Sequence, residues 1–100
     1  MFIETQGLTA KMFASEVGQV FTAETVPEPV ELTLLRLVEG SAPNPGFRTP
    51  FSLIFTTPMS VLLLDAQYRL KSASGKEYLL HLSPIVSPLD GQRHYQAQFN

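Results

Sequence analysis

Two histidines and a few carboxylates are the groups of this chain that could carry acid–base chemistry or hold a metal. His81 and His94 are the only histidines, and Asp65, Glu77 and Asp90 are the acids that could pair with them. Protein metal sites usually draw two ligands from positions a few residues apart on one element, and neither histidine lies in such a ligand pattern. The sequence therefore predicts no metal site, no cofactor and no catalytic residue, with structural or surface roles for both histidines.

Nucleophilic and phosphate-binding motifs are also lacking. No serine stands in a Gly-x-Ser-x-Gly elbow, and there is no cysteine. Ser74-Gly75-Lys76 looks like the end of a phosphate-binding loop, but Leu70 stands where that motif needs its first glycine and Glu77 where it needs serine or threonine. We interpret this stretch as a hairpin turn and expect the protein not to be an enzyme.

One loop carries the residues most suited to contact a partner. Residues 39–50 contain three prolines and two glycines, and within them Phe47 stands beside Arg48. Aromatic residues and arginine are enriched at protein interfaces, so Phe47 and Arg48 are candidate partner contacts. The alternative is that Phe47 packs the loop onto the domain. A long loop of this kind is often mobile or functional, and we expect residues 40–50 to be the most mobile or partner-dependent segment.

Size and charge restrict the class of protein. The 100 residues fit one domain over 1–100, and a hydrophobic share of 44% with 16% charged residues is too apolar for a disordered chain. No apolar run approaches the ~18 residues of a membrane span. The net charge is −2, and the lysines and arginines are scattered from Lys11 to Arg93, which argues against nucleic acid as a partner. Because the first six residues do not look like a secretory signal, we expect a cytoplasmic protein.

The only stretch with helix character is residues 9–16. Thr9 is placed to cap it with its hydroxyl, and Phe13 and Val17 have the i, i+4 spacing of one helical face. Gly18 is expected to end this helix of one or two turns in a left-handed conformation.

Six later runs alternate apolar and polar residues as strands do. They are residues 20–25, 30–38, 51–57, 66–71, 77–85 and 94–99. The second run changes parity, because Val30, Leu32 and Leu34 are followed by Leu35 and Leu37; this predicts a β-bulge or a strand buried on both faces. Residues 59–64 are apolar but short, and we favour a turn that covers one end of the core over a strand extension. Asp90-Gly91 predicts a tight turn into the last strand.

The fold class that follows is mainly β, with one short N-terminal helix. Six short strands with turns about every ten residues predict a small antiparallel barrel or a tight sandwich. We favour the barrel, because closure removes strand edges that this chain has few charged residues to protect. The alternating parity predicts a core, listed here: Phe21, Leu32, Leu34, Phe51, Leu53, Phe55, Tyr68, Leu70, Leu80, Leu82, Tyr95, Ala97 and Phe99.

Several pieces, in order and spacing, are similar to a known family. They are Leu8-Thr9 with Phe13, Val17-Gly18 with Phe21, residues 50–55, residues 68–70, residues 82–84 and residues 95–100. Over nearly the whole chain they resemble a family of small uncharacterised bacterial proteins, known as a domain of unknown function. The resemblance implies no established activity and no catalytic residues. Some family members are encoded beside phage-tail-collar-type proteins, which implies a structural or assembly partner.

Two functions from different classes remain. The leading hypothesis is a non-enzymatic barrel that serves as a binding or assembly module for a protein partner, such as a phage-tail-like or appendage protein. The alternative is a small-ligand-binding barrel or a minor enzyme with a pocket at the barrel mouth near Met59, Tyr68, His81 or His94. A polar cleft would favour the second hypothesis, and a filled core with an apolar surface patch the first. No particular oligomeric state follows from the sequence.

Overall fold

The six segments predicted as strands form strands. The computed structural model describes residues 2–3, 9–25, 28–40, 50–86, 88 and 90–99. The long strands in these residues are β2 (Val20–Ala23), β3 (Val30–Glu39), β4 (Phe51–Pro58), β5 (Ala66–Ser72), β6 (Glu77–Ile85) and β7 (Gln92–Phe99). All neighbours among them pair antiparallel.

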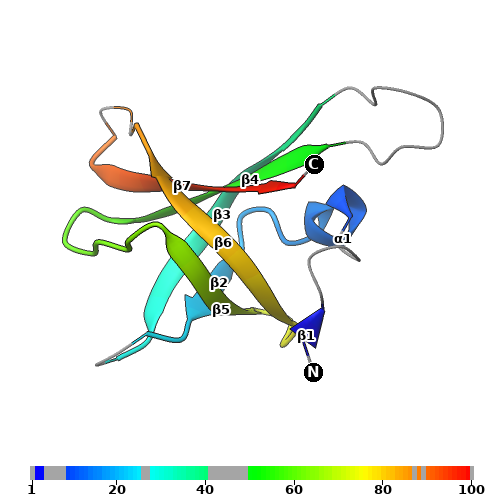
Figure 1. Cartoon of the computed structure of the whole chain (residues 1–100), viewed down its shortest axis with the longest axis horizontal. Helices are drawn as coiled ribbons and strands as arrows, with labels where there is room; N and C mark the ends of the chain where they lie inside the picture. The colour runs from blue at the N-terminus through cyan, green and yellow to red at the C-terminus, as the bar shows by residue number, and fades with distance from the viewer. Residues whose placement is uncertain are drawn as a thin grey trace.

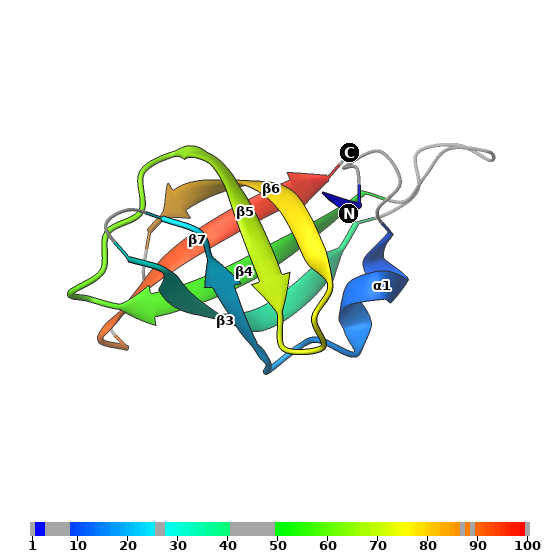
Figure 2. The ribbon, with the colours of Figure 1, turned by 90° about the horizontal axis from the view of Figure 1, so that it is seen from below.

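These strands close into the predicted barrel and not into a sandwich. They follow the order β6-β5-β2-β3-β4-β7, and β6 also pairs with β7 (Figures 1 and 2). The closing contact is short, because in the described residues it runs only from Ser83 opposite Gln96 to Ile85 opposite His94. A further strand that the sequence did not predict, β1 (Phe2–Ile3), pairs parallel with β6 at Glu77 and Tyr78.

A filled core occupies the inside of the barrel. Every predicted core residue except Tyr68 is buried, and Tyr68 is only partly buried at the edge of the cluster. The core also takes in Phe13, Ala23, Leu63 and Tyr78. Its aromatic rings pack against one another; for example, Phe21 and Phe55 meet edge to face with ring centroids 5.3 Å apart.

The predicted change of parity in the second strand is a β-bulge. In the pairing of β3 with β4 the register shifts between Leu34 and Arg36. The extra residue, Leu35, is 40% exposed, and after it Leu37 packs against the core. The bulge therefore lets both Leu34 and Leu37 face inward although they are three residues apart.

The short helix α1 (Ala10–Ala14) packs on the end of the barrel where β6 and β7 do not pair (Figure 2). Its Phe13 is fully buried, with its ring 4.9 Å from that of Tyr78 and 6.3 Å from that of Phe99. Two expectations were wrong: the Thr9 side chain makes no capping hydrogen bond, and Val17 is exposed because the helix ends before it. Gly18 does adopt the expected left-handed conformation, with φ of +88°.

The connections follow the turn chemistry of the sequence. Ser72 to Glu77 forms the predicted hairpin turn, in which the Gly75 N–H donates to the Ser72 carbonyl at 2.9 Å. Residues 59–64 form a turn and then an irregular segment, whose Leu63 joins the core. Among the described helices there is none long and apolar enough to cross a membrane.

Candidate functional site

Each histidine lies beside one carboxylate. His81 hydrogen-bonds Asp65, and both of these side chains are more than half exposed. His94 Nε2 lies 2.7 Å from Asp90 Oδ2. The two pairs belong to different parts of the barrel surface, and within the described part of the chain no three or more His, Cys, Asp or Glu residues gather as metal ligands.

The second pair has a structural position. His94 points to the outside of the barrel, between Thr56 of β4 and Ile85 of β6, yet it is only 2% exposed. Asp90 also accepts the Gln92 N–H at 3.0 Å, so its carboxylate ties the start of β7 to the preceding turn. The hydrogen bonds from His94 and Gln92 hold the pKa of Asp90 below its usual value, because both stabilise the ionised carboxylate.

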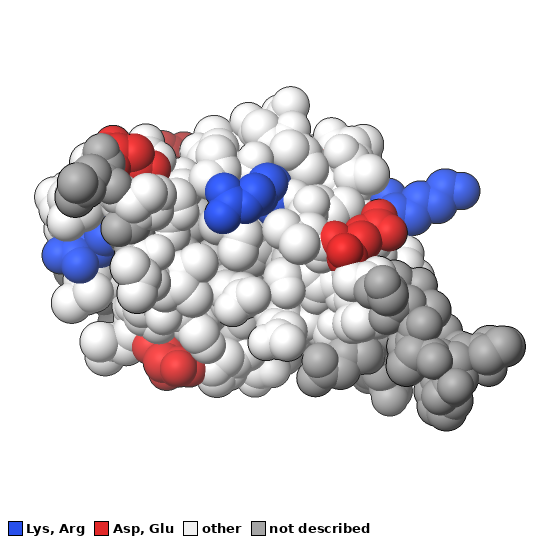
Figure 3. Space-filling model, turned by 90° about the horizontal axis from the view of Figure 1, so that it is seen from above, with Lys and Arg blue, Asp and Glu red and all other residues white. Residues whose placement is uncertain are grey.

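The predicted partner contacts, Phe47 and Arg48, lie outside the described residues. So does most of the predicted mobile loop, residues 41–49. On the face of the barrel shown in Figure 3, Lys, Arg, Asp and Glu side chains are scattered and form no stripe of one sign. That face offers no electrostatic track of the kind that nucleic acid needs.

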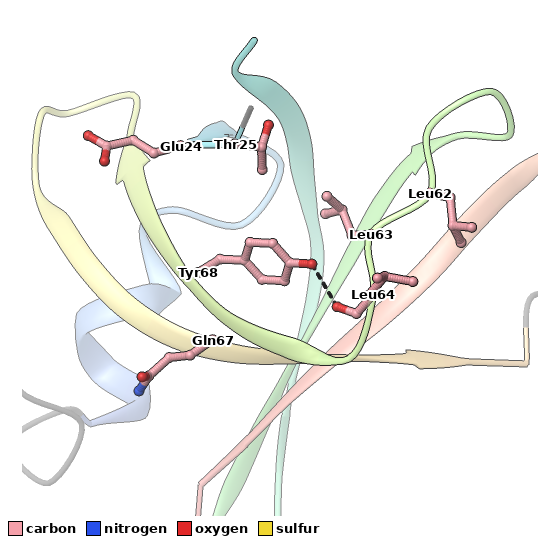
Figure 4. Close-up of a pocket in the computed structure, with 7 residues that line it drawn as sticks. All are labelled: Glu24, Thr25, Leu62, Leu63, Leu64, Gln67 and Tyr68. Atoms are coloured by element: carbon pink, nitrogen blue, oxygen red, sulfur yellow. Dashed lines mark hydrogen bonds between the residues drawn. The ribbon is translucent and has the colours of Figure 1, made fainter. Parts of the chain in front are cut away.

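The described residues form a hollow at the barrel mouth. We call it the mouth hollow; it has a volume of about 590 Å³ and is lined by Glu24, Thr25, Leu62, Leu63, Leu64, Gln67 and Tyr68 (Figure 4). It lies at the end of the barrel opposite α1. Of the four residues that the sequence placed near a pocket, Tyr68 lines the mouth hollow, whereas Met59, His81 and His94 do not.

The partial exposure of Tyr68 follows from this position. Tyr68 has the inward parity of β5, as predicted, but β2 ends at Ala23 and so does not cover it. Its hydroxyl donates a 2.7 Å hydrogen bond to the Leu64 carbonyl across the mouth hollow (Figure 4). The tyrosine ring therefore forms a wall of the mouth hollow and not part of the closed core.

The leucine loop, residues 61–64, forms the other wall and is fastened to the barrel. The Leu63 side chain is buried, and the Leu63 N–H donates to the Tyr95 hydroxyl at 3.1 Å. The same hydroxyl lies 3.4 Å from the Val61 carbonyl. Burial and hydrogen bonding thus fix the backbone of a segment that has no regular secondary structure.

The leucines on either side of Leu63 point away from the core. Leu62 is 60% exposed and Leu64 is 69% exposed. Two nearby carboxylates have partners at the surface: Glu24 pairs with Arg69 at 3.4 Å, and Asp65 hydrogen-bonds His81. The mouth hollow thus combines an apolar part, formed by the leucines and the Tyr68 ring, with the polar residues Glu24, Thr25 and Gln67.

A buried carboxylate at the other end of the barrel has a structural role. Glu16 is 6% exposed and accepts a hydrogen bond of 3.1 Å from Ser74, which joins the segment after α1 to the β5–β6 turn. Its second oxygen and the Tyr78 hydroxyl have no hydrogen-bond partner among the described residues. Burial and the nearby Glu16 charge raise the pKa of Tyr78.

The leucine loop is a candidate functional feature that the sequence did not reveal. The signal available was a run of three consecutive leucines that ends at Asp65. Such a run has no period, so the sequence did not show which leucine is buried and which two are exposed.

The comparisons with known proteins give a family and no activity. No curated protein and no solved structure matches the chain. The model of a domain of unknown function, DUF6916, matches residues 8–99, which include α1 and all six strands of the barrel. This chain therefore belongs to the DUF6916 family.

Proposed function

We propose that this chain is a non-enzymatic binding or assembly module that holds a protein partner at the mouth hollow. The observation that carries the proposal is the leucine loop, which is fastened to the barrel through Leu63 while Leu62 and Leu64 remain exposed. Large aliphatic side chains at 60% and 69% exposure gain free energy when a partner removes them from water.

The fixed backbone makes the leucine loop suited to binding. A flexible loop loses conformational freedom when it is ordered against a partner, and this loss weakens the complex. Here the Tyr95 hydroxyl and the buried Leu63 side chain have already ordered the loop. Side chains that bury in a shaped apolar hollow commonly supply most of the binding energy of an interface.

A small-ligand-binding barrel is the second candidate, because a volume of about 590 Å³ lies within the range of small-molecule sites. Such sites also place a few polar groups so that they converge on the ligand. In the mouth hollow the Tyr68 hydroxyl already donates to Leu64, and Glu24 already pairs with Arg69. Because these polar groups already have partners within the protein, the hollow is better suited to an apolar side chain of a protein partner than to a polar small molecule.

The finer features of the proposal rest on sequence. A phage-tail-like or appendage-type partner is what the family resemblance implies. A cytoplasmic location is part of the proposal because the chain has no cysteine and so no disulfide that an oxidising compartment would protect.

The test is affinity purification of the full chain from the organism that encodes it, with quantitative mass spectrometry. The test variant is Leu62→Ser with Leu64→Ser. The matched control is Leu35→Ser with Val38→Ser, which also removes two exposed aliphatic side chains but from β3, away from the mouth hollow. We expect a co-purifying protein that the test variant loses and the control retains.

Two other outcomes would contradict the proposal. Equal recovery of every co-purifying protein with the test variant would place the binding surface elsewhere. A small molecule retained by the purified chain in native mass spectrometry, and lost in the test variant, would support the ligand-binding barrel instead.

A further inference from the structure

Strand β5 is paired along nearly its whole length on one side but along only part of its length on the other. On the first side β6 pairs with it from Ala66 to Lys71. On the second side β2 pairs only with Leu70 to Ser72, and one further hydrogen bond runs from the Glu24 N–H to the Arg69 carbonyl at 2.9 Å. The first part of β5 therefore extends past the end of β2.

The alternation of hydrogen bonds identifies which backbone groups lie along this second side. In an antiparallel strand, residues that bond toward one neighbour alternate with residues that bond toward the other. Because the Arg69 carbonyl bonds toward β2, the N–H and carbonyl of Gln67 point to the same side. No described residue forms a backbone hydrogen bond with Gln67 there.

The open backbone of Gln67 borders the mouth hollow. Gln67 and Tyr68 line it from β5, Glu24 and Thr25 line it from the end of β2, and the leucine loop lies across from them (Figure 4). A backbone donor and acceptor with no partner among the described residues thus lie beside the leucines and the Tyr68 ring of the mouth hollow. This is the combination with which proteins bind an extended peptide as an added strand: main-chain hydrogen bonds give affinity and the hollow gives specificity.

We propose that the partner inserts an extended peptide segment that pairs with β5 at Gln67, in line with β2 and antiparallel to β5. This inference rests on the proposed function and names the chemistry of its partner. The peptide residue opposite Gln67 faces outward like Gln67, and its neighbours in the peptide face inward. An inward side chain then packs between Tyr68, Leu62 and Leu64, so that position of the peptide is aliphatic or aromatic.

Charge specifies the outward position of the peptide. The carboxylates of Glu24 and Asp65 belong to the residues at the two ends of the open segment, and each is 62% exposed. Arg69 pairs with Glu24 and His81 hydrogen-bonds Asp65, but both carboxylates keep more than half of their surface exposed and open to a partner. The complementary peptide has a lysine or arginine at the position opposite Gln67, next to its apolar residue.

The probe is a short peptide selected against the immobilised full chain from a phage-displayed random library and then synthesised. Gln67→Pro removes the open N–H, and proline is tolerated where a strand's N–H has no partner in the sheet. Gln67→Ala is the matched control, since it keeps the N–H and removes the side chain. We expect Gln67→Pro to weaken binding at least about tenfold, because a hydrogen bond at the interface is lost, and Gln67→Ala to change it by less than about threefold.

Two further measurements keep the inference testable if Gln67→Pro does not fold. Methylation of alternate backbone nitrogens of the peptide should abolish binding in one of the two alternation patterns only. Amide hydrogen exchange at Gln67, followed by NMR, should be fast in the free protein and slow in the complex.

The outcomes separate the inference from the proposed function. Strand addition is overturned if the peptide needs Leu62 and Leu64 but binds Gln67→Pro as tightly as wild type and tolerates every N-methyl group. That result would still support a partner-binding surface at the mouth hollow. If the selection yields no peptide, or only peptides that bind the Leu62→Ser, Leu64→Ser variant unchanged, both are wrong.

Discussion

Removing one hydroxyl from each of two buried tyrosines should have different effects on stability. Tyr95 and Tyr78 are both fully buried, and replacement by phenylalanine removes the same atom from each. The Tyr95 hydroxyl accepts the Leu63 N–H at 3.1 Å, whereas the Tyr78 hydroxyl has no hydrogen-bond partner among the described residues. Comparing the two variants therefore separates the effect of losing the hydrogen bond to Leu63 from the effect of losing the oxygen atom.

The expected size of each effect follows from these contacts. In Tyr95→Phe the buried Leu63 N–H loses its acceptor, which lowers the free energy of unfolding by about 1–3 kcal/mol. The contacts of the same hydroxyl with Val61 and Thr57, at 3.4 and 3.5 Å, are long and add little. In Tyr78→Phe no hydrogen bond is lost and a buried hydroxyl is removed, so the free energy of unfolding should stay the same or rise by up to about 1 kcal/mol.

The assay is urea unfolding followed by circular dichroism, together with thermal melts of both variants. Tyr95→Phe should lower Tm by at least about 4 °C, as expected for a domain of this size that loses 1 kcal/mol. The same variant should speed amide hydrogen exchange in the leucine loop and weaken binding at the mouth hollow. Equal destabilisation by both variants would refute the reasoning, because the effect would then come from packing and not from the Leu63 hydrogen bond.

Three other predictions concern the core, the pH dependence of stability and the loop of residues 40–50. Phe55→Ala should lower the free energy of unfolding by about 3–5 kcal/mol in denaturant melts, and a loss below about 1 would show that Phe55 is not core. The pKa of Tyr78 is raised in the folded state above its unfolded value of 10.0, so folding favours the neutral hydroxyl. The contribution of this group to the free energy of unfolding is fully present below pH 10.0, and it is lost as the pH rises through the folded-state pKa. Melts from pH 8 upward should therefore show a steeper decline above about pH 10 for wild type than for Tyr78→Phe, and parallel curves would contradict this. Once a partner is in hand, Phe47→Ala with Arg48→Ala should weaken its binding by about 2 kcal/mol at unchanged Tm; unchanged affinity would exclude these contacts.

The sequence by itself determined the strands and their inward faces, and it favoured a barrel over a sandwich. Alternation of apolar and polar residues is a local property, since successive side chains of a strand point to opposite faces whatever the rest of the fold does. The same rule showed a change of parity after Leu34, which predicted either a β-bulge or a strand buried on both faces, and the structure has the bulge. It placed Phe55 and twelve other residues in the core, of which only Tyr68 is not fully buried.

Tertiary structure decided the burial of several side chains that strand alternation alone does not predict. Tyr68 has inward parity but faces the mouth hollow, because its exposure depends on how far the separate strand β2 extends. His94 has outward parity and is nonetheless buried between strands β4 and β6. Glu16 is buried against Ser74, 58 positions later in the chain. Burial of each of these side chains depends on distant segments, which a period within one strand does not encode.

The leucine loop shows the difference most clearly. Leu62, Leu63 and Leu64 are chemically identical and consecutive, so the sequence could establish only that this segment is apolar. The hydroxyl of Tyr95, 32 positions after Leu63, accepts the N–H of that residue alone, and the Leu63 side chain then enters the core. The other two leucines remain at the surface. In a segment without regular secondary structure, this one long-range hydrogen bond determines which side chain points inward.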